Sequence, residues 1–260
     1  DGGMTAVAPE ALPLIELDGI GKTYANGTVA LAGVDAEIRE GGFVSLVGPS
    51  GCGKSTLLRI VAGLIAPDAG TLSWPATGER PSDIGFVFQE ATLMPWARVA
   101  DNVHLPLKLA GVPKEKAGPR IMDALARVGL ADFANAFPRE LSGGMKMRVS
   151  IARALVTEPP VLLMDEPFAA LDEFTREKLD DDLLDLWTAQ RFTTVFVTHS
   201  IYESVFLSER VLVMGARPGR ILADIAVDAP YPRGRAFRES RTYMDTCAAV
   251  SAALREGVTS

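Results

Sequence analysis

The hydrophobic residues of this chain follow two spacings, one typical of strands and one typical of helices. Short apolar runs of the kind that forms buried strands occupy 43–47, 84–88, 161–164 and 193–198. Alternating apolar and polar residues predict one further strand over 29–38. Apolar residues at helical spacing predict helices over 54–64 and 173–189. Strands that alternate with helices in this way indicate an α/β fold with a parallel sheet.

Helical spacing dominates the middle of the chain, and strand-like runs return after it. The stretch from about 90 to 156 predicts a helical insertion in the α/β domain. Further on, 211–214 and 220–227 flank a Pro218–Gly219 turn and predict a β-hairpin.

The two ends of the chain lie outside this pattern. Residues 1–13 are small and aperiodic, so we expect a flexible N-terminal lead, with Asp1-Gly2-Gly3 as an expression remnant ahead of Met4. Residues 228–260 are expected to form a C-terminal extension that carries a final helix over 236–255.

Composition narrows the class of protein. Of the 260 residues, 48% are hydrophobic and 23% charged, which excludes disorder for most of the chain. The formal net charge of −7 argues against broad binding to nucleic-acid backbones. No apolar run approaches the ~18–20 residues that span a bilayer, and we expect no signal peptide. Cys52 and Cys247 make no disulfide framework, which favours a reducing cytosol.

One segment carries a phosphate-binding motif. The pattern G-x-x-x-x-G-K-[ST] is fitted by Gly48-Pro49-Ser50-Gly51-Cys52-Gly53-Lys54-Ser55-Thr56. The motif joins a predicted strand to a predicted helix, so its backbone N–H groups and the helix N-terminus can surround a phosphate. Lys54 is expected between the β- and γ-phosphates, and the Ser55 hydroxyl is expected on Mg²⁺. The same helix N-terminus can lower the pKa of Cys52 and make it alkylatable, but we favour the interpretation of this cysteine as a small loop residue without a function of its own.

Ionisable side chains follow two of the predicted buried strands. Asp165 and Glu166 come directly after 161–164, at the strand end where open α/β sheets bind ligands. Asp165 suits a Mg²⁺ role, and Glu166 suits the polarisation of an attacking water. His199 follows 193–198 and is expected to hold the γ-phosphate or that water. His104 lies in the helical stretch, and we interpret it as structural.

A second motif makes a family resemblance specific. Leu141-Ser142-Gly143-Gly144-Met145 lies upstream of the acidic pair. The order of phosphate loop, glutamine, LSGG, acidic pair and histidine resembles the nucleotide-binding domain of the ATP-binding-cassette (ABC) family over about residues 14–225. The resemblance implies a P-loop NTPase core with an antiparallel β subdomain and a helical signature subdomain over about 90–156. It places the nucleotide-binding domain at 14–227.

The resemblance also implies roles for single residues. Tyr24 would stack on adenine, and Gln89 would sense Mg²⁺ and water. Without the resemblance, Tyr24 would be interpreted as an aromatic packing residue and Gln89 as a surface residue. Asp172 would contact a dimer partner. Ser142 to Gly144 would touch the γ-phosphate of ATP held by the other subunit, because Ser142 begins a second helix N-terminus and thus a second anion site. Two ATP molecules would then be sandwiched in a head-to-tail dimer.

Local motifs resemble the importer branch for nitrate, sulfonates, taurine and pyrimidine precursors. Met145 stands where the commonest signature has Gln, a replacement that is frequent in this branch, and Met147 stands where the branch has Gln. We expect hydrolysis to survive with an altered rate. Leu93-Met94-Pro95-Trp96 is either a satellite of the core or a groove for a short helix of a membrane subunit. Ala216-Arg217-Pro218-Gly219-Arg220-Ile221 also resembles this branch, or is a solvated hairpin.

We therefore expect a cytoplasmic ATPase subunit, peripheral on the inner face of the membrane, that binds ATP and Mg²⁺ and powers a permease for uptake of a small solute. Its partners would be a second such subunit, the permease and, indirectly, a solute-binding protein, with no nucleic acid. An exporter or lipid-trafficking ATPase and a soluble ABC ATPase remain as alternatives. A regulator without catalysis is rejected, because Lys54, Asp165, Glu166 and His199 are all present.

Overall fold

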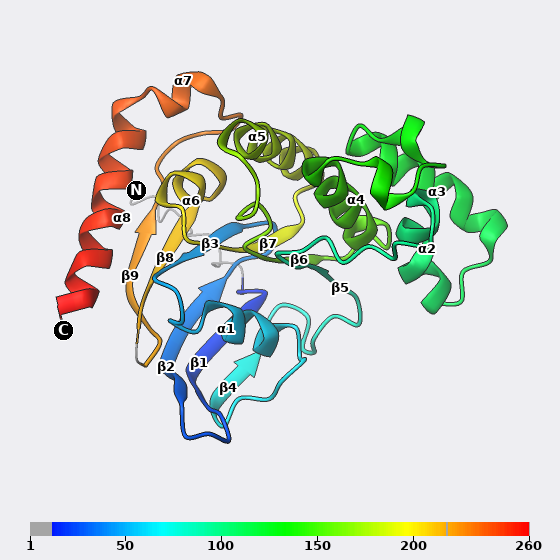
Figure 1. Cartoon of the computed structure of the whole chain (residues 1–260). Coiled ribbons are helices and arrows are strands. Elements are labelled where there is room, and N and C mark those ends of the chain that lie inside the picture. Colours follow the sequence, from blue (N-terminus) through cyan, green and yellow to red (C-terminus); the bar gives the residue numbers. More distant parts are fainter. Residues whose placement is uncertain (1–11, 217, 260) are drawn as a thin grey trace, which may run out of the picture.

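The computed structural model describes residues 12–216 and 218–259, so most of the lead expected at 1–13 lies outside the described residues, as does Arg217. A six-stranded sheet forms the centre, in the order β5-β6-β7-β3-β8-β9 (Figure 1). Its strands are β3 (Phe43–Val47), β5 (Ile84–Val87), β6 (Val161–Asp165), β7 (Thr193–Thr198), β8 (Arg210–Gly215) and β9 (Arg220–Ala226). The first five in this spatial order pair in parallel, and β9 is antiparallel to β8. The predicted strands and the predicted hairpin are confirmed.

The central strands are buried on both faces, as their apolar runs predict. All residues of β3 and of β7 are buried, and Val44 of β3 lies opposite Val195 of β7. Phe43 packs edge-on against Trp187 with ring centroids 5.6 Å apart. Because a strand of this kind is covered by helices on both faces, its carboxyl end is the part left free for a ligand.

A second, antiparallel sheet has the order β2-β1-β4, at the bottom of Figure 1. It consists of β1 (Ile15–Thr23), β2 (Val29–Ile38) and β4 (Ala69–Ser73). The sequence pattern did not predict β4. This short edge strand is mostly exposed and carries only one large apolar residue, so it has no hydrophobic pattern to detect.

Three helices cover the central sheet: α1 (Lys54–Val61), α5 (Glu173–Gln190) and α6 (Ile201–Leu207). The predicted helix 54–64 ends three residues early, and Gly63 follows with φ 70°. A left-handed glycine is the usual stop for a helix. The helix predicted over 173–189 is confirmed as α5. Helix α6 was not predicted, because seven residues are too few for a clear helical period.

Helices fill the middle of the chain and lie together at the right of Figure 1. They are α2 (Val99–Leu109), α3 (Lys114–Arg127) and α4 (Gly143–Leu155), with short 3-10 turns at Ala131–Phe133 and Pro138–Glu140. This agrees with the helical spacing over 90–156. Buried residues of all three helices join one core with the strands, so the segment packs against the sheet.

The final helix is divided, contrary to the prediction of one helix over 236–255. The chain forms α7 (Arg235–Arg238) and α8 (Arg241–Thr259). Ser240 causes the break, because its Oγ accepts a hydrogen bond from the backbone N–H of Tyr243 and so caps a new helix. Helix α8 packs on α6, β8 and β9.

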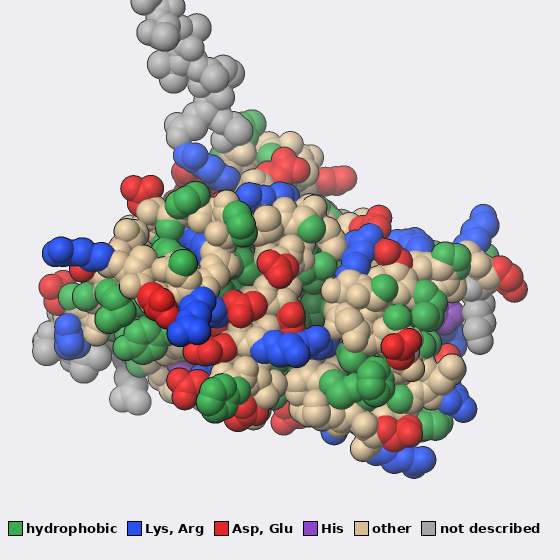
Figure 2. All heavy atoms as spheres, turned by 90° about the horizontal axis from the view of Figure 1, so that it is seen from above, with side chains coloured by type: hydrophobic (Ala, Val, Ile, Leu, Met, Phe, Trp, Pro, Cys, Tyr) green, Lys and Arg blue, Asp and Glu red, His purple; other side chains and the backbone are tan. Residues whose placement is uncertain are grey.

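The surface carries charges of both signs. Figure 2 shows acidic and basic side chains interspersed over the face seen from above, without a broad basic area. Among the described residues, no helix combines the length and the apolar character that crossing a bilayer requires.

Candidate functional site

The predicted site residues come together where the parallel strands end. Strands β5, β6, β7 and β3 are neighbours, and their carboxyl ends share one edge of the sheet. Gln89 follows β5, the acidic pair closes β6, His199 follows β7, and the phosphate loop follows β3. Residues from four distant segments therefore reach one place because of the strand order, not because of their spacing in the sequence.

The phosphate loop is shaped by glycines that nothing larger could replace. Gly53 precedes α1 with φ 92°, and a Cβ there would lie 2.6 Å from a Leu31 side-chain carbon. A Cβ on Gly48 would lie 2.6 Å from the Met214 carbonyl oxygen. No side chain caps α1, so its first N–H groups remain available to an anion.

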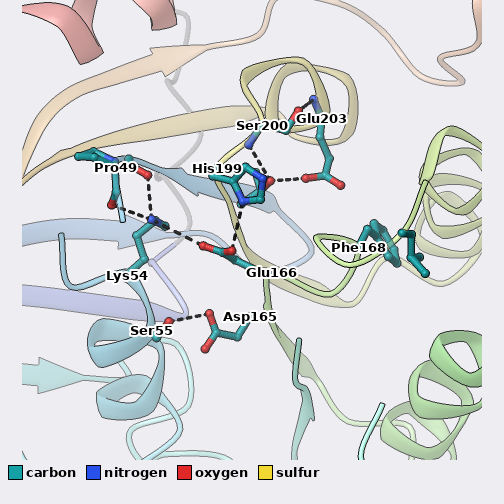
Figure 3. Close-up of polar contacts among 12 residues, drawn as sticks. Pro49, Lys54, Ser55, Asp165, Glu166, Phe168, His199, Ser200 and Glu203 are labelled. Carbon is teal, nitrogen blue, oxygen red and sulfur yellow. Dashed lines mark hydrogen bonds and ion pairs between the residues drawn. The ribbon is translucent and has the colours of Figure 1, made fainter. Parts of the chain in front are cut away.

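Lys54 is buried in the loop and points along it (Figure 3). Only 4% of the residue is exposed. Its Nζ donates hydrogen bonds to the carbonyl oxygens of Gly48 at 2.8 Å and Pro49 at 3.1 Å, and lies 3.8 Å from Glu166 Oε1. A buried ammonium surrounded by oxygens places one positive charge at the centre of the loop, where a phosphate would need it.

Ser55 and Asp165 place two oxygen atoms side by side, of the kind that binds hard cations such as Mg²⁺. Ser55 Oγ donates to Asp165 Oδ1 at 2.8 Å. Desolvation raises the pKa of Asp165, with the charge of Glu166 adding to the rise and the Ser55 hydrogen bond opposing it. Within the described ranges, no group of three or more His, Cys, Asp or Glu side chains could hold a metal alone. The pair fits Mg²⁺, which is usually bound by one or two protein oxygens plus phosphates and water.

Glu166 adopts a backbone conformation that turns it away from Asp165. Its φ is 48°, in the left-handed region that non-glycine residues seldom adopt, and its N–H donates to the Val197 carbonyl at 2.9 Å. Its Oε2 lies 3.2 Å from His199 Nδ1. The two neighbouring carboxylates therefore face different partners, Ser55 and His199, as Figure 3 shows.

Tyr24 and Gln89 lie at the edges of this group. The Tyr24 hydroxyl is hydrogen-bonded to Thr56 Oγ1 at 2.9 Å, and its ring is partly exposed. Gln89 is exposed two residues after β5. An exposed ring beside the phosphate loop can accept a flat heterocycle.

Ser142 to Gly144 and Asp172 form a second, separate group. Ser142 caps α4 by accepting from Met145 N at 3.3 Å, and Asp172 caps α5 by accepting from Thr175 N at 3.0 Å. A Cβ on Gly144 would lie 2.8 Å from Thr175 Cγ2, so the starts of α4 and α5 lie side by side. The Thr175 hydrogen bonds lower the pKa of Asp172. Within the described ranges, no hydrogen bond or ion pair joins this group to the phosphate loop.

The structure favours the interpretation of Cys52 as a small loop residue over that of an activated thiol. The thiol is fully buried under the phosphate loop, and its burial raises the pKa despite the nearby Lys54 charge. Its backbone N–H donates to the Pro49 carbonyl at 3.3 Å. Cys52 is therefore a packing residue that supports the loop. His104 lies within α2 as a partly buried side chain.

Arg153 and Asn102 hold the segment after Gln89; Asp101-Asn102-Val103 is similar to the importer branch in sequence, whereas Arg153 carries no such signal. Arg153 of α4 donates to the carbonyl oxygens of Ala91 and Thr92, each at 2.9 Å. Asn102 of α2 is fully buried and accepts from Met94 N at 2.7 Å. A buried polar side chain with several backbone partners was not detectable without the fold, because each residue sits in an ordinary helical pattern.

The chain matches proteins of one family along most of its length. Residues 31–169 match the family described as ABC transporter. The taurine import ATP-binding protein TauB of Rhizobium johnstonii is 49% identical over 207 residues, which are 79% of each protein. The aliphatic sulfonates import ATP-binding protein SsuB of Bacillus cereus is 42% identical over 238 residues, covering 87% of this chain and 92% of that protein. The dimeric post-hydrolysis structure of the ATP-binding cassette MJ0796 with ADP and Pi has a TM-score of 0.71 at 35% identity, covering 83% of this chain and 100% of that chain.

Proposed function

The chain belongs to the ABC transporter family, and we propose that it is the ATP-hydrolysing subunit of an importer for a small solute. The main support is that relatives at 42% and 49% identity over most of the chain are named import ATP-binding proteins. The taurine and sulfonate in those names favour a small anionic solute. Separate permease and solute-binding proteins would select the solute, because no residue of this site serves to recognise it.

ATP binding is assigned to the phosphate loop, residues 48–56. The free N–H groups at the start of α1 and the Lys54 ammonium would hold the β- and γ-phosphates. The hydrogen bonds of Lys54 to Gly48 and Pro49 would be exchanged for bonds to phosphate oxygens. The exposed ring of Tyr24 would stack on the adenine.

Mg²⁺ would be held by Ser55 and Asp165, with Gln89 nearby. The ion supplies neutralisation of the phosphate charge and fixes the orientation of the phosphates. The chain's own contribution is to keep a hydroxyl and a carboxylate together before the ion arrives, as the 2.8 Å hydrogen bond between them indicates.

Hydrolysis is assigned to Glu166 and His199. Glu166 would accept a proton from water as the water oxygen bonds to the γ-phosphorus and the bond to the bridging oxygen of ADP breaks. With hydrogens on both ring nitrogens, His199 would donate from Nδ1 to the Glu166 carboxylate and so orient it, and from Nε2 to the γ-phosphate. The left-handed backbone of Glu166 separates this role from the Mg²⁺ role of Asp165.

A second copy of the chain would complete the site. The starts of α4 and α5 present Ser142, Gly143 and Asp172 away from the phosphate loop of the same chain. In a head-to-tail dimer, Ser142 to Gly144 would touch the γ-phosphate on the partner's loop. The relative MJ0796 is a dimeric cassette, which supports this arrangement.

The permease would dock on the segment Leu93–Trp96. Trp96 is 77% exposed, whereas Met94 is tied to the buried Asn102. An exposed indole on a fixed loop is an anchor for a partner helix. Because Arg153 joins the preceding residues Ala91 and Thr92 to the signature helix α4, a change at the nucleotide could be passed to the docked permease.

Domain boundaries and location follow from this proposal. Residues 14–227 would be the nucleotide-binding domain, with its helical subdomain over about 90–156, and 228–260 its C-terminal extension. The subunit would lie at the cytoplasmic face of the membrane, held there by the permease.

Affinity purification of the tagged chain from mildly solubilised native membranes, followed by mass spectrometry, tests the importer assignment. We expect a multi-spanning protein at stoichiometric level and, after cross-linking, a solute-binding protein. A stoichiometric membrane protein without any solute-binding protein would favour an exporter. Recovery only in the soluble fraction, without a membrane protein, would contradict the proposal in favour of a soluble ATPase.

A further inference from the structure

Two buried carboxylic acids lie behind His199 and have no part in the site described above. Asp180 comes from α5 and Glu203 from α6. Only 4% of Asp180 and 6% of Glu203 is exposed. A carboxylate that is taken this far from water needs a compensating partner.

Asp180 and Glu203 are neighbours, and the charge of Glu203 adds to the rise in the pKa of Asp180. Within the described ranges, Asp180 Oδ1 and Glu203 Oε1 have no hydrogen-bond donor. Two ionised carboxylates only accept hydrogen bonds, so a hydrogen bond between these oxygens would require a proton on one of the acids. Burial raises the pKa of both acids.

The surrounding charges favour one shared proton. The titratable groups that face the pair are Arg176 and Asp181 on α5, His199 after β7, and Arg238 and Tyr243 on α7 and α8, with Cys247 beside Tyr243. The positive charges of Arg176 and Arg238 are balanced by Asp181, which pairs with Arg238 at 2.7 Å, and by one negative charge on the pair. A pair with no proton or with two would leave a net charge in this cluster, which includes the two buried acids.

Glu203 holds both neighbours of His199. Its Oε2 accepts a short hydrogen bond from the Thr198 hydroxyl. Thr198 Oγ1 in turn accepts from the Ser200 N–H at 3.0 Å, and Ser200 Oγ accepts from the Glu203 N–H at 3.3 Å. Figure 3 shows Ser200 and Glu203 beside His199, which points to Glu166. The position of the imidazole therefore depends on the position of the Glu203 carboxylate.

We propose that Asp180 and Glu203, sharing one proton, are positioning residues for His199, and that loss of this proton displaces His199 from Glu166. The inference rests on the proposed ATPase function. When the pH rises and the proton leaves, the two neighbouring negative charges repel each other. Glu203 then releases Thr198, and the segment around His199 shifts. The phosphate loop is untouched, so the change falls on kcat and not on KM.

The experiment compares wild type, Asp180→Asn and the matched control Asp185→Asn, an exposed acid on the same helix. ATP hydrolysis is measured from about pH 6 to about pH 10, a range that covers the highest pKa values known for buried carboxyls. We expect the wild-type kcat to fall roughly tenfold or more on the alkaline side with KM nearly constant. In Asp180→Asn the side-chain amide N–H takes the place of the shared proton and does not ionise in this range. The alkaline fall of kcat is therefore expected to disappear in this variant. The control is expected to behave as wild type.

A second comparison uses Glu203 itself. Glu203→Ala removes the acceptor for Thr198 and is expected to lower kcat roughly tenfold or more. Glu203→Gln is expected to recover most of that loss, because its amide oxygen accepts from Thr198 and its N–H donates to Asp180. Equal losses in both variants would assign Glu203 a merely structural role and overturn the proposal.

NMR of the imidazole signals gives a readout that needs no turnover. The chain has two histidines, so a His104→Gln variant assigns the His199 signal. We expect an alkaline inflection of this signal in wild type that is missing in Asp180→Asn. An absent inflection, or one that persists in Asp180→Asn, overturns the proposal. If wild type hydrolyses no ATP at any pH, the proposed function fails, while the NMR titration still tests the pair.

Discussion

Ser55 donates a hydrogen bond of 2.8 Å to Asp165 and thereby joins the first turn of α1 to the end of β6, across 110 positions of sequence. The contact brings a hydroxyl and a carboxylate to one side of the phosphate loop. Neither the hydroxyl nor the carboxylate would suffice to bind Mg²⁺ by itself. The strand order that brings the two together therefore makes the site.

Asp165→Asn is expected to raise the Mg²⁺ concentration for half-maximal hydrolysis by roughly tenfold or more. The folded environment raises the pKa of Asp165, mainly by desolvation. Protonation removes a ligand, so the wild-type Mg²⁺ requirement is expected to increase as the pH falls through this raised pKa. Magnesium titrations of the ATPase at several pH values check this. An unchanged Mg²⁺ requirement in Asp165→Asn contradicts the assignment.

Ser142→Arg is expected to prevent ATP-dependent dimers while nucleotide still binds to the monomer. The bulky cation would stand at the start of α4, where the partner's γ-phosphate is proposed to lie. Light scattering after gel filtration with ATP, and fluorescent-nucleotide binding, measure the two properties. Ser142→Ala is the control, because it removes the helix cap, at a cost of about 1 kcal/mol, without adding bulk. Dimers of Ser142→Arg in ATP would rule out a role for Ser142 across the interface.

Native thiols are expected to resist alkylation. Cys52 is fully buried, and burial raises the pKa of Cys247 to about 11. At about pH 8 that pKa lowers the thiolate fraction of Cys247 by roughly two orders of magnitude relative to a free cysteine. Mass spectrometry after iodoacetamide treatment, with and without urea, is the measurement. Rapid labelling of Cys52 in the folded chain would show that the loop opens.

Trp96→Ala is expected to weaken association with the permease at least tenfold, as for a central aromatic anchor. The measurement is the amount of membrane protein that co-purifies with the tagged chain. Met244→Ala on α8 is the matched control, since Met244 is also a large exposed apolar residue and lies on a different element. Equal recovery with both variants would place the permease contact elsewhere.

Much of this fold was predictable because its central strands are short and rich in apolar residues. Runs such as 43–47 and 193–198 favour buried strands, and a motif at the end of each indicates where a ligand binds. The edge strand β4 and the short helix α6 carry too little periodic signal. Ser240 divides the last helix through a single capping hydrogen bond, which an apolar pattern cannot reveal.

The contacts between helices were not predictable for a different reason. Asp180 and Glu203 lie on separate helices, and each reads as a solvated acid when spacing alone is considered. Only the packing of α5 against α6 shows that both are buried together. The same holds for Cys52, whose helix-terminal position suggests reactivity, whereas the loop covers it.

The central claim is that two copies of this chain enclose ATP and that Glu166 drives its hydrolysis. The most direct measurement is phosphate release and molar mass of Glu166→Gln in the presence of Mg²⁺ and ATP. We predict that kcat falls by roughly two to four orders of magnitude while ATP remains bound and the chain runs as a stable dimer. Near-normal phosphate release, or a monomer that binds ATP without dimerising, would contradict the account.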